Sequence, residues 1–185
     1  EKELDHSAGL RLNGALSIAQ TEGRWQELKR QATTAQLYNV DIRILDKDII
    51  KKEFPMMYTD DLKGGVLMPG DGAADPSGVT HMLAKGARLN GAQIFEKSPV
   101  EKILTKNGRV AGVRVNDQEI ECEYVVLAAG MWSRQIGEKM GVSIPLYPAE
   151  HFYVITEPIE NLPKTLPIIR DFDSSIYFKE DAGKL

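Results

Sequence analysis

Residues 124–128 read Tyr-Val-Val-Leu-Ala, and this uninterrupted apolar run constrains the fold more than any other stretch of the chain. A strand that is apolar at every position is typical of parallel sheets covered by helices on both faces. The run continues into the small residues Ala129 and Gly130, and the pattern that follows predicts a short helix ending at Gly141. We therefore predict a central parallel strand at Tyr124–Ala128 that turns directly into a helix.

A β-hairpin is predicted just before this strand. Val100–Thr105 and Val110–Val115 are rich in apolar residues and are separated by Asn107-Gly108. Asn-Gly strongly favours a two-residue hairpin turn, because both residues tolerate the positive φ angles that such a turn requires. A second turn then leads to a short strand at Ile120-Glu121.

Capping residues indicate three further helices. Thr21, Asp46 and Asp75 each stand before a helical pattern, and their side chains are of the type that accepts hydrogen bonds from the first amides of a helix. Pro76 suits the first helical position after Asp75. Short apolar runs precede the first two helices, whereas the glycine-rich stretch Gly64–Asp75 precedes the third and is predicted to be a turn region. This mixture predicts an α+β fold.

The composition argues against several classes of function. The 23 basic residues are interleaved with 27 acidic ones and form no basic stripe, so we expect no nucleic-acid partner. The apolar stretches are far shorter than the roughly 20 residues that a membrane helix requires, so we expect no membrane partner. Cys122 is the single cysteine, and with three scattered histidines it supports neither a disulfide nor a metal site. We expect a soluble, cytoplasmic protein, or one of the mitochondrial matrix if the source is eukaryotic.

The order of the segments resembles the middle of the FAD-binding domain in the glycine oxidase/D-amino acid oxidase superfamily. The segments that carry this resemblance are Gly91-Ala92, Pro99–Ile103, Arg109–Val113, Ile120 and Tyr124–Ser133. Further segments are similar to the dimethylglycine and sarcosine dehydrogenase (oxidase) branch of that superfamily. These are Pro69–Gly72 with Asp75-Pro76, and Pro148–Thr156 followed by Leu166–Asp171 and Ile176–Phe178. The similarity covers nearly the whole chain.

This resemblance implies parts of two domains. Residues 1–63 correspond to a portion of the substrate domain, residues 64–147 to the middle of the FAD-binding domain, and residues 148–185 to a return into the substrate domain. The Rossmann glycines, the flavin-tethering histidine, the C-terminal flavin segment and the folate-binding domains of the family have no match in these 185 residues. Since the chain also opens without an initiating Met, we expect a piece of a longer protein that is inactive alone and carries no FAD.

The resemblance also implies residue roles. Val100 matches the position whose main chain meets the adenine ring, and Ala129, Gly130 and Trp132 match the segment that lines the flavin dinucleotide. His151 and Tyr177 match the active-site histidine and tyrosine of the family.

The two proposed catalytic residues suit the chemistry. A neutral imidazole can take the proton from a substrate ammonium, and a tyrosine hydroxyl can hold a carboxylate or orient the imidazole. Without the resemblance, packing explains both residues equally simply, since His151 is expected in a strand and Tyr177 stands between Ile176 and Phe178. Arg170 is a candidate for binding a substrate carboxylate, although its acidic neighbours in sequence favour a surface ion pair.

The implied function is that of an FAD-dependent amine oxidoreductase acting on CH–NH donors. It would oxidise a small N-methylated amino acid, of the dimethylglycine or sarcosine type, by hydride transfer to flavin. The resulting iminium would hydrolyse to formaldehyde or pass its one-carbon unit to folate held by a domain outside this chain. Two alternatives stay open: a glycine or D-amino acid oxidase, and a non-catalytic regulatory subunit of pyruvate dehydrogenase phosphatase on the same scaffold.

Overall fold

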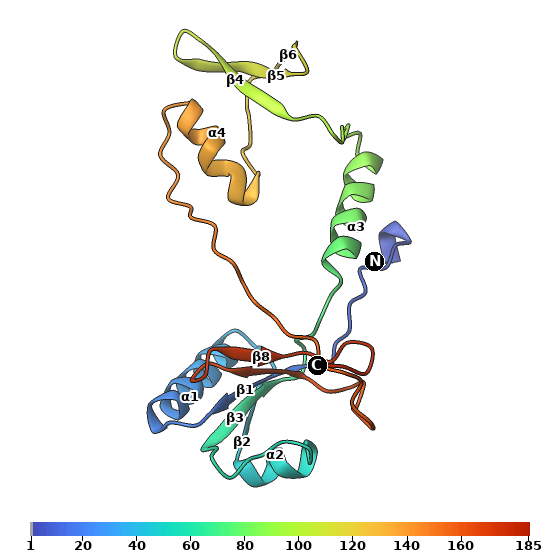
Figure 1. Ribbon diagram of the computed structural model, residues 1–185, viewed down its shortest axis with the longest axis vertical. Helices are drawn as coiled ribbons and strands as arrows, with labels where there is room; N and C mark the ends of the chain where they lie inside the picture. The colour runs from blue at the N-terminus through green and yellow to red at the C-terminus, as the bar shows by residue number, and fades with distance from the viewer. Residues whose placement is uncertain (1) are drawn as a thin grey trace. The chain divides into compact units, whose positions relative to one another are not determined.

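The computed structural model describes residues 2–185, and the chain divides into two compact units (Figure 1). The first unit comprises the chain up to Gly91 together with Val154–Leu185, and the second unit comprises Ala92–Tyr153. A five-stranded mixed sheet forms the first unit and a three-stranded antiparallel sheet lies in the second. The predicted α+β class is therefore confirmed. Within residues 2–185, no helix has the length and apolarity needed to cross a membrane.

The sheet of the first unit has the strand order β2-β3-β1-β7-β8. Its strands are β1 (Ala15–Ala19), β2 (Arg43–Leu45), β3 (Gly64–Met68), β7 (Ile168–Asp171) and β8 (Ile176–Phe178). The strands β1 and β7 pair in parallel, and the other neighbours pair antiparallel.

Strand β3 corrects the sequence prediction, because Gly64–Met68 was expected to be part of a turn. The strand lies between β1 and β2, where Val66 and Leu67 are buried. A Cβ atom on Gly65 would lie 2.9 Å from the carbonyl oxygen of Ser17 and 3.1 Å from the Cδ1 atom of Ile50. A side chain at position 65 would therefore crowd β1 and α2. Close approach of this kind is a common reason for glycine inside a strand.

Two helices cover opposite faces of this sheet. Helix α1 (Glu22–Leu37) buries Leu28 and Ala32 against Val66. Helix α2 (Lys47–Glu53) buries Ile50 in a larger cluster that contains Leu16 from β1. Side chains alternate between faces along a strand, so β1 and β3 supply both clusters.

The predicted caps of α1, α2 and α3 are confirmed. Thr21 accepts from the amide of Arg24, and Asp46 accepts from the amide of Ile49. Asp75 accepts from two amides at the start of α3 (Pro76–Leu89), which has Pro76 in its first turn. Helix α3 buries none of its residues, and a short 3-10 helix, η1 (Lys2–Leu4), lies against it.

The predicted hairpin is the centre of the second unit. Strands β4 (Val100–Lys106) and β5 (Arg109–Val115) flank Asn107 and Gly108, whose φ angles are +53° and +74°. Strand β6 (Gln118–Glu121) completes the sheet. A 3-10 turn, η2 (Gly130–Trp132), then leads into helix α4 (Ser133–Lys139).

The predicted central strand at Tyr124–Ala128 is wrong. This segment has no regular structure, and Tyr124 and Val126 are 84% and 88% exposed. A strand apolar on both faces is stable only between hydrogen-bonded neighbours and covering layers. Within residues 2–185 no strand pairs with it. Just before it, the amide of Cys122 donates to the carbonyl of Ala111 on β5.

Candidate functional site

The predicted site residues belong to both units. Tyr177 lies on β8 of the first unit, whereas His151 and the predicted cofactor-binding residues lie in the second unit. The convergence of His151 and Tyr177 on one substrate therefore remains a prediction.

Tyr177 belongs to a row of residues that crosses three strands. Its Cα partner on β7 is Arg170, and the partner of Arg170 on β1 is Ser17. Residues directly opposite each other on neighbouring strands project from the same face of a sheet, with Cβ atoms about 5 Å apart. Ser17, Arg170 and the half-exposed Tyr177 therefore lie on the same face of the sheet. Ser17 is also opposite Val66 on β3, against which α1 packs, so this is the face that α1 covers.

The ion pair of Arg170 does not involve its neighbours in sequence. Its Nη2 atom lies 3.3 Å from the Oδ2 atom of Asp71, which is 99 residues away. Asp171 instead accepts from the amides of Asp173 and Ser174 through its Oδ1 atom. The surface ion pair favoured from the sequence exists, but Asp71 is its partner.

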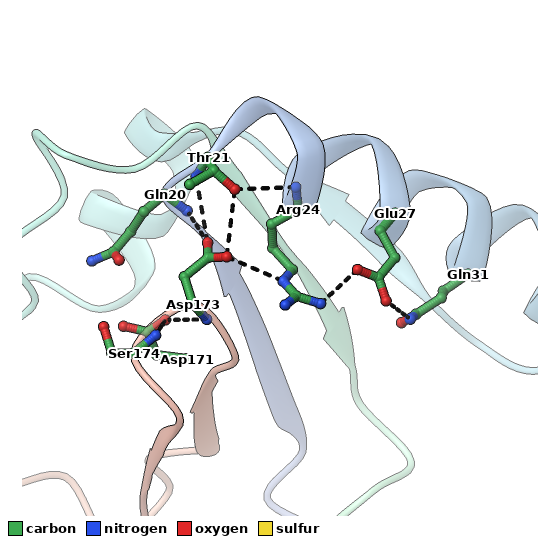
Figure 2. A network of polar contacts seen from close by, with 8 residues as sticks. All are labelled: Gln20, Thr21, Arg24, Glu27, Gln31, Asp171, Asp173 and Ser174. Carbon is green, nitrogen blue, oxygen red and sulfur yellow. Dashed lines mark hydrogen bonds and ion pairs between the residues drawn. The ribbon is translucent and has the colours of Figure 1, made fainter.

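The Asp173 carboxylate connects the turn between β7 and β8 to the start of α1 through hydrogen bonds and an ion pair (Figure 2). Its carboxylate accepts from the amides of Gln20 and Thr21 at 3.1 and 3.4 Å, from the Thr21 hydroxyl at 3.4 Å, and from the Nε atom of Arg24 at 3.3 Å. Burial raises the pKa of Asp173, but the amides of Gln20 and Thr21 and the Arg24 guanidinium outweigh it and leave the pKa below its usual value. The hairpin that carries Arg170 and Tyr177 is held in place by this network.

Glu180 anchors the chain just beyond β8. Its side chain is 2% exposed and accepts from the Nη1 atom of Arg11 at 2.8 Å and from the amide of Gly183 at 2.9 Å. The amide of Gly183, followed by Arg11, lowers the pKa of Glu180 in spite of its burial. Sequence analysis missed this pair, because Arg11 and Glu180 are 169 residues apart and neither lies in a recognisable motif.

The predicted cofactor-binding residues of the second unit present an accessible surface. Gly130 has a φ angle of +53°, and among the described residues no heavy atom beyond its two chain neighbours lies within 4 Å of where its Cβ would stand. Ala129 accepts from the amide of Trp132, whose ring is exposed, and Val100 starts β4 with a partly exposed side chain. An open backbone approach beside an exposed indole is compatible with a flat aromatic cofactor such as FAD.

His151 is exposed and lies in a segment without helix or strand, so the strand expected around it is wrong. The apolar residues that follow His151 were the only local signal for that strand. Within residues 2–185, no group of three or more His, Cys, Asp or Glu residues has an arrangement that could hold a metal ion.

Comparison with known proteins gives one consistent result. The family described as "DAO: FAD dependent oxidoreductase" matches residues 1–185. The chain is 37% identical over 172 residues to 4-methylaminobutanoate oxidase (formaldehyde-forming) from Paenarthrobacter nicotinovorans, covering 93% of this chain and 21% of that protein. It is 36% identical to mitochondrial sarcosine dehydrogenase from Homo sapiens, covering 96% of this chain and 20% of that protein.

A solved structure gives the same answer for the fold. The crystal structure of L-proline dehydrogenase from P. horikoshii matches with a TM-score of 0.88 and 26% sequence identity, over 99% of this chain and 49% of that chain. The chain thus spans about a fifth of the length of the two curated relatives.

Proposed function

The chain belongs to the DAO family of FAD-dependent oxidoreductases, and on this basis we propose that the complete protein oxidises a small N-methylated amino acid. The observation that carries the proposal is the identity of 36–37%, over more than nine-tenths of the chain, to two enzymes. Both are named for N-methylated amino acid substrates, 4-methylaminobutanoate and sarcosine. Dimethylglycine is the third candidate substrate.

The proposed chemistry is removal of a hydride from an N-methyl carbon. FAD supplies the acceptor for this hydride when it is bound. In this proposal Val100, Ala129, Gly130 and Trp132 hold the cofactor through exposed backbone and the indole ring. The loss of the hydride leaves an iminium, and water converts it to formaldehyde and the demethylated amine, unless folate captures the one-carbon unit first.

His151 and Tyr177 are proposed to prepare the amine. An ammonium group has no lone pair with which to stabilise the iminium, so a base must take its proton before the hydride leaves. We assign this proton transfer to the imidazole of His151. Tyr177 is proposed to orient the substrate or the imidazole through its hydroxyl, and the pairing of β8 with β7 fixes the backbone that carries it.

The test is reduction of the flavin in the full-length protein without oxygen. Sarcosine, dimethylglycine and 4-methylaminobutanoate would be compared in a stopped-flow instrument with glycine and L-proline as controls. We expect at least one N-methylated substrate to reduce the flavin about 100-fold faster than glycine, since glycine has no N-methyl group to oxidise. Faster reduction by glycine or L-proline than by every N-methylated substrate would contradict the proposal.

A further inference from the structure

We propose that Arg170 binds the carboxylate of the substrate, beside Tyr177 on the same face of the sheet. The proposal rests on the function proposed above and identifies a specificity-determining residue for it. Arg170 and Tyr177 are direct cross-strand partners on β7 and β8, so their side chains start about 5 Å apart. A carboxylate held by Arg170 would therefore also lie within reach of the Tyr177 hydroxyl.

Two other arginines of the first unit, Arg11 and Arg24, are engaged more strongly than Arg170. Arg11 donates to the buried Glu180 from both terminal nitrogens, at 2.8 and 2.9 Å. Arg24 bonds to Asp173 and Glu27 and lies over the ring of Phe172, 5.4 Å from its centroid. These side chains serve to hold the fold.

Arg170 retains the capacity to bind a ligand. Its contact with Asp71 is 3.3 Å long, whereas charge-assisted hydrogen bonds of this type are usually about 2.7–2.9 Å. This contact uses Nη2, and a guanidinium has five N–H donors arranged to fit a carboxylate with two parallel bonds. The side chain is 40% exposed, so a ligand can reach it from solvent.

Space is also available beside Arg170. Arg170 borders a cavity of about 140 Å³ between α1 and the sheet, together with the polar residues Ser17 and Gln31. The rest of the lining is apolar: Ala15, Leu28, Ala35, Ile42, Val66, Met68 and Phe172. A cation at the edge of a small, largely apolar cavity suits a small aliphatic carboxylate. Amines without a carboxylate would gain nothing from this arrangement.

The experiment measures carboxylate binding in the full-length, FAD-loaded protein. Acetate, which has no C–N bond to oxidise, would be titrated into the oxidised protein by calorimetry, and the dissociation constant of sarcosine would be taken from the concentration dependence of flavin reduction. Arg170→Gln removes the charge and Arg170→Lys keeps it without the planar fork. Arg43→Gln is the matched control, because Arg43 is an exposed strand residue whose partner on β3 is Leu67, on the opposite face of the sheet.

Arg170→Gln should weaken binding of acetate and of sarcosine by roughly 10- to 150-fold, the usual effect of losing hydrogen bonds to a charged group. Arg170→Lys should show a smaller loss. Arg43→Gln should bind acetate and sarcosine within about threefold of the wild-type affinity, and Arg170→Gln should bind dimethylamine, which has no carboxylate, within about threefold of the wild-type affinity. Acetate binding that is absent in the wild type, or equal in wild type and both Arg170 variants, would overturn the proposal. If no N-methylated amino acid reduces the wild-type flavin, the proposed function fails separately, and the acetate titration still decides the role of Arg170.

Discussion

Replacing Asp173 with alanine should destabilise the first unit, because this carboxylate joins the β7–β8 turn to the start of α1 (Figure 2). The side chain is 17% exposed, so water replaces its lost partners only in part. An exposed ion pair alone contributes about 0–1 kcal/mol, and a hydrogen bond to a charged group contributes about 1.5–3 kcal/mol. Since three of its four hydrogen bonds are 3.3–3.4 Å long, we expect a loss of about 2 kcal/mol rather than the sum of the upper limits.

The pH dependence of this loss gives a second, independent check. The pKa of Asp173 is lowered in the folded protein from 3.8, so its contribution is complete well above pH 4 and disappears as the pH falls through the folded-state value. The difference in the free energy of unfolding between wild type and Asp173→Ala should therefore be largest near neutral pH and shrink below about pH 4.

Urea unfolding followed by far-UV circular dichroism at pH 7 and pH 3 would measure both effects. Asp181→Ala is the matched control, because the Asp181 side chain is 73% exposed and its ion pair with Lys179 is 3.7 Å long. The reasoning is refuted if Asp173→Ala unfolds at the same urea concentration as the control at pH 7, or if its deficit is undiminished at pH 3.

Three other outcomes follow from the structure. Glu180→Ala should lower the free energy of unfolding by about 3 kcal/mol in the same urea assay, because it removes a buried charge that two donors hold; a loss below that of Asp181→Ala would contradict this. Gly65→Ala should cost about 1–3 kcal/mol through overlap with β1 and α2, while Gly23→Ala, which has open space on α1, should be neutral or stabilising; equal effects would disprove the packing argument. In the full-length protein, His151→Asn and Tyr177→Phe should each slow flavin reduction by roughly two to four powers of ten, and wild-type rates at full flavin occupancy would contradict their proposed roles.

The features predicted correctly from the sequence depend on interactions within a few residues. The caps at Thr21, Asp46 and Asp75 bond to amides two or three positions away, and Asn107-Gly108 determines its turn locally. Such signals survive in any tertiary context, because the atoms involved are always close together.

The features that were missed depend on partners far away in the chain. The pairs Arg170–Asp71 and Arg11–Glu180 join segments that only the folded sheet brings together. The apolar run Tyr124–Ala128 indicates a preference for burial, but a preference does not supply the neighbouring strands. Tyr177 and Arg170 could be named as candidates separately, whereas their common face became visible only from the strand register.

The most direct test of the proposed demethylation is the identity of the carbon atom that is oxidised. Sarcosine labelled with ¹³C in its methyl group would be mixed anaerobically with the full-length, FAD-loaded protein for a single turnover, and the products would be quantified against the flavin reduced. The proposal predicts one labelled formaldehyde and one glycine for each flavin reduced, because the hydride leaves the N-methyl carbon. Glyoxylate and labelled methylamine in place of formaldehyde would show oxidation of the methylene carbon and would contradict the proposed function.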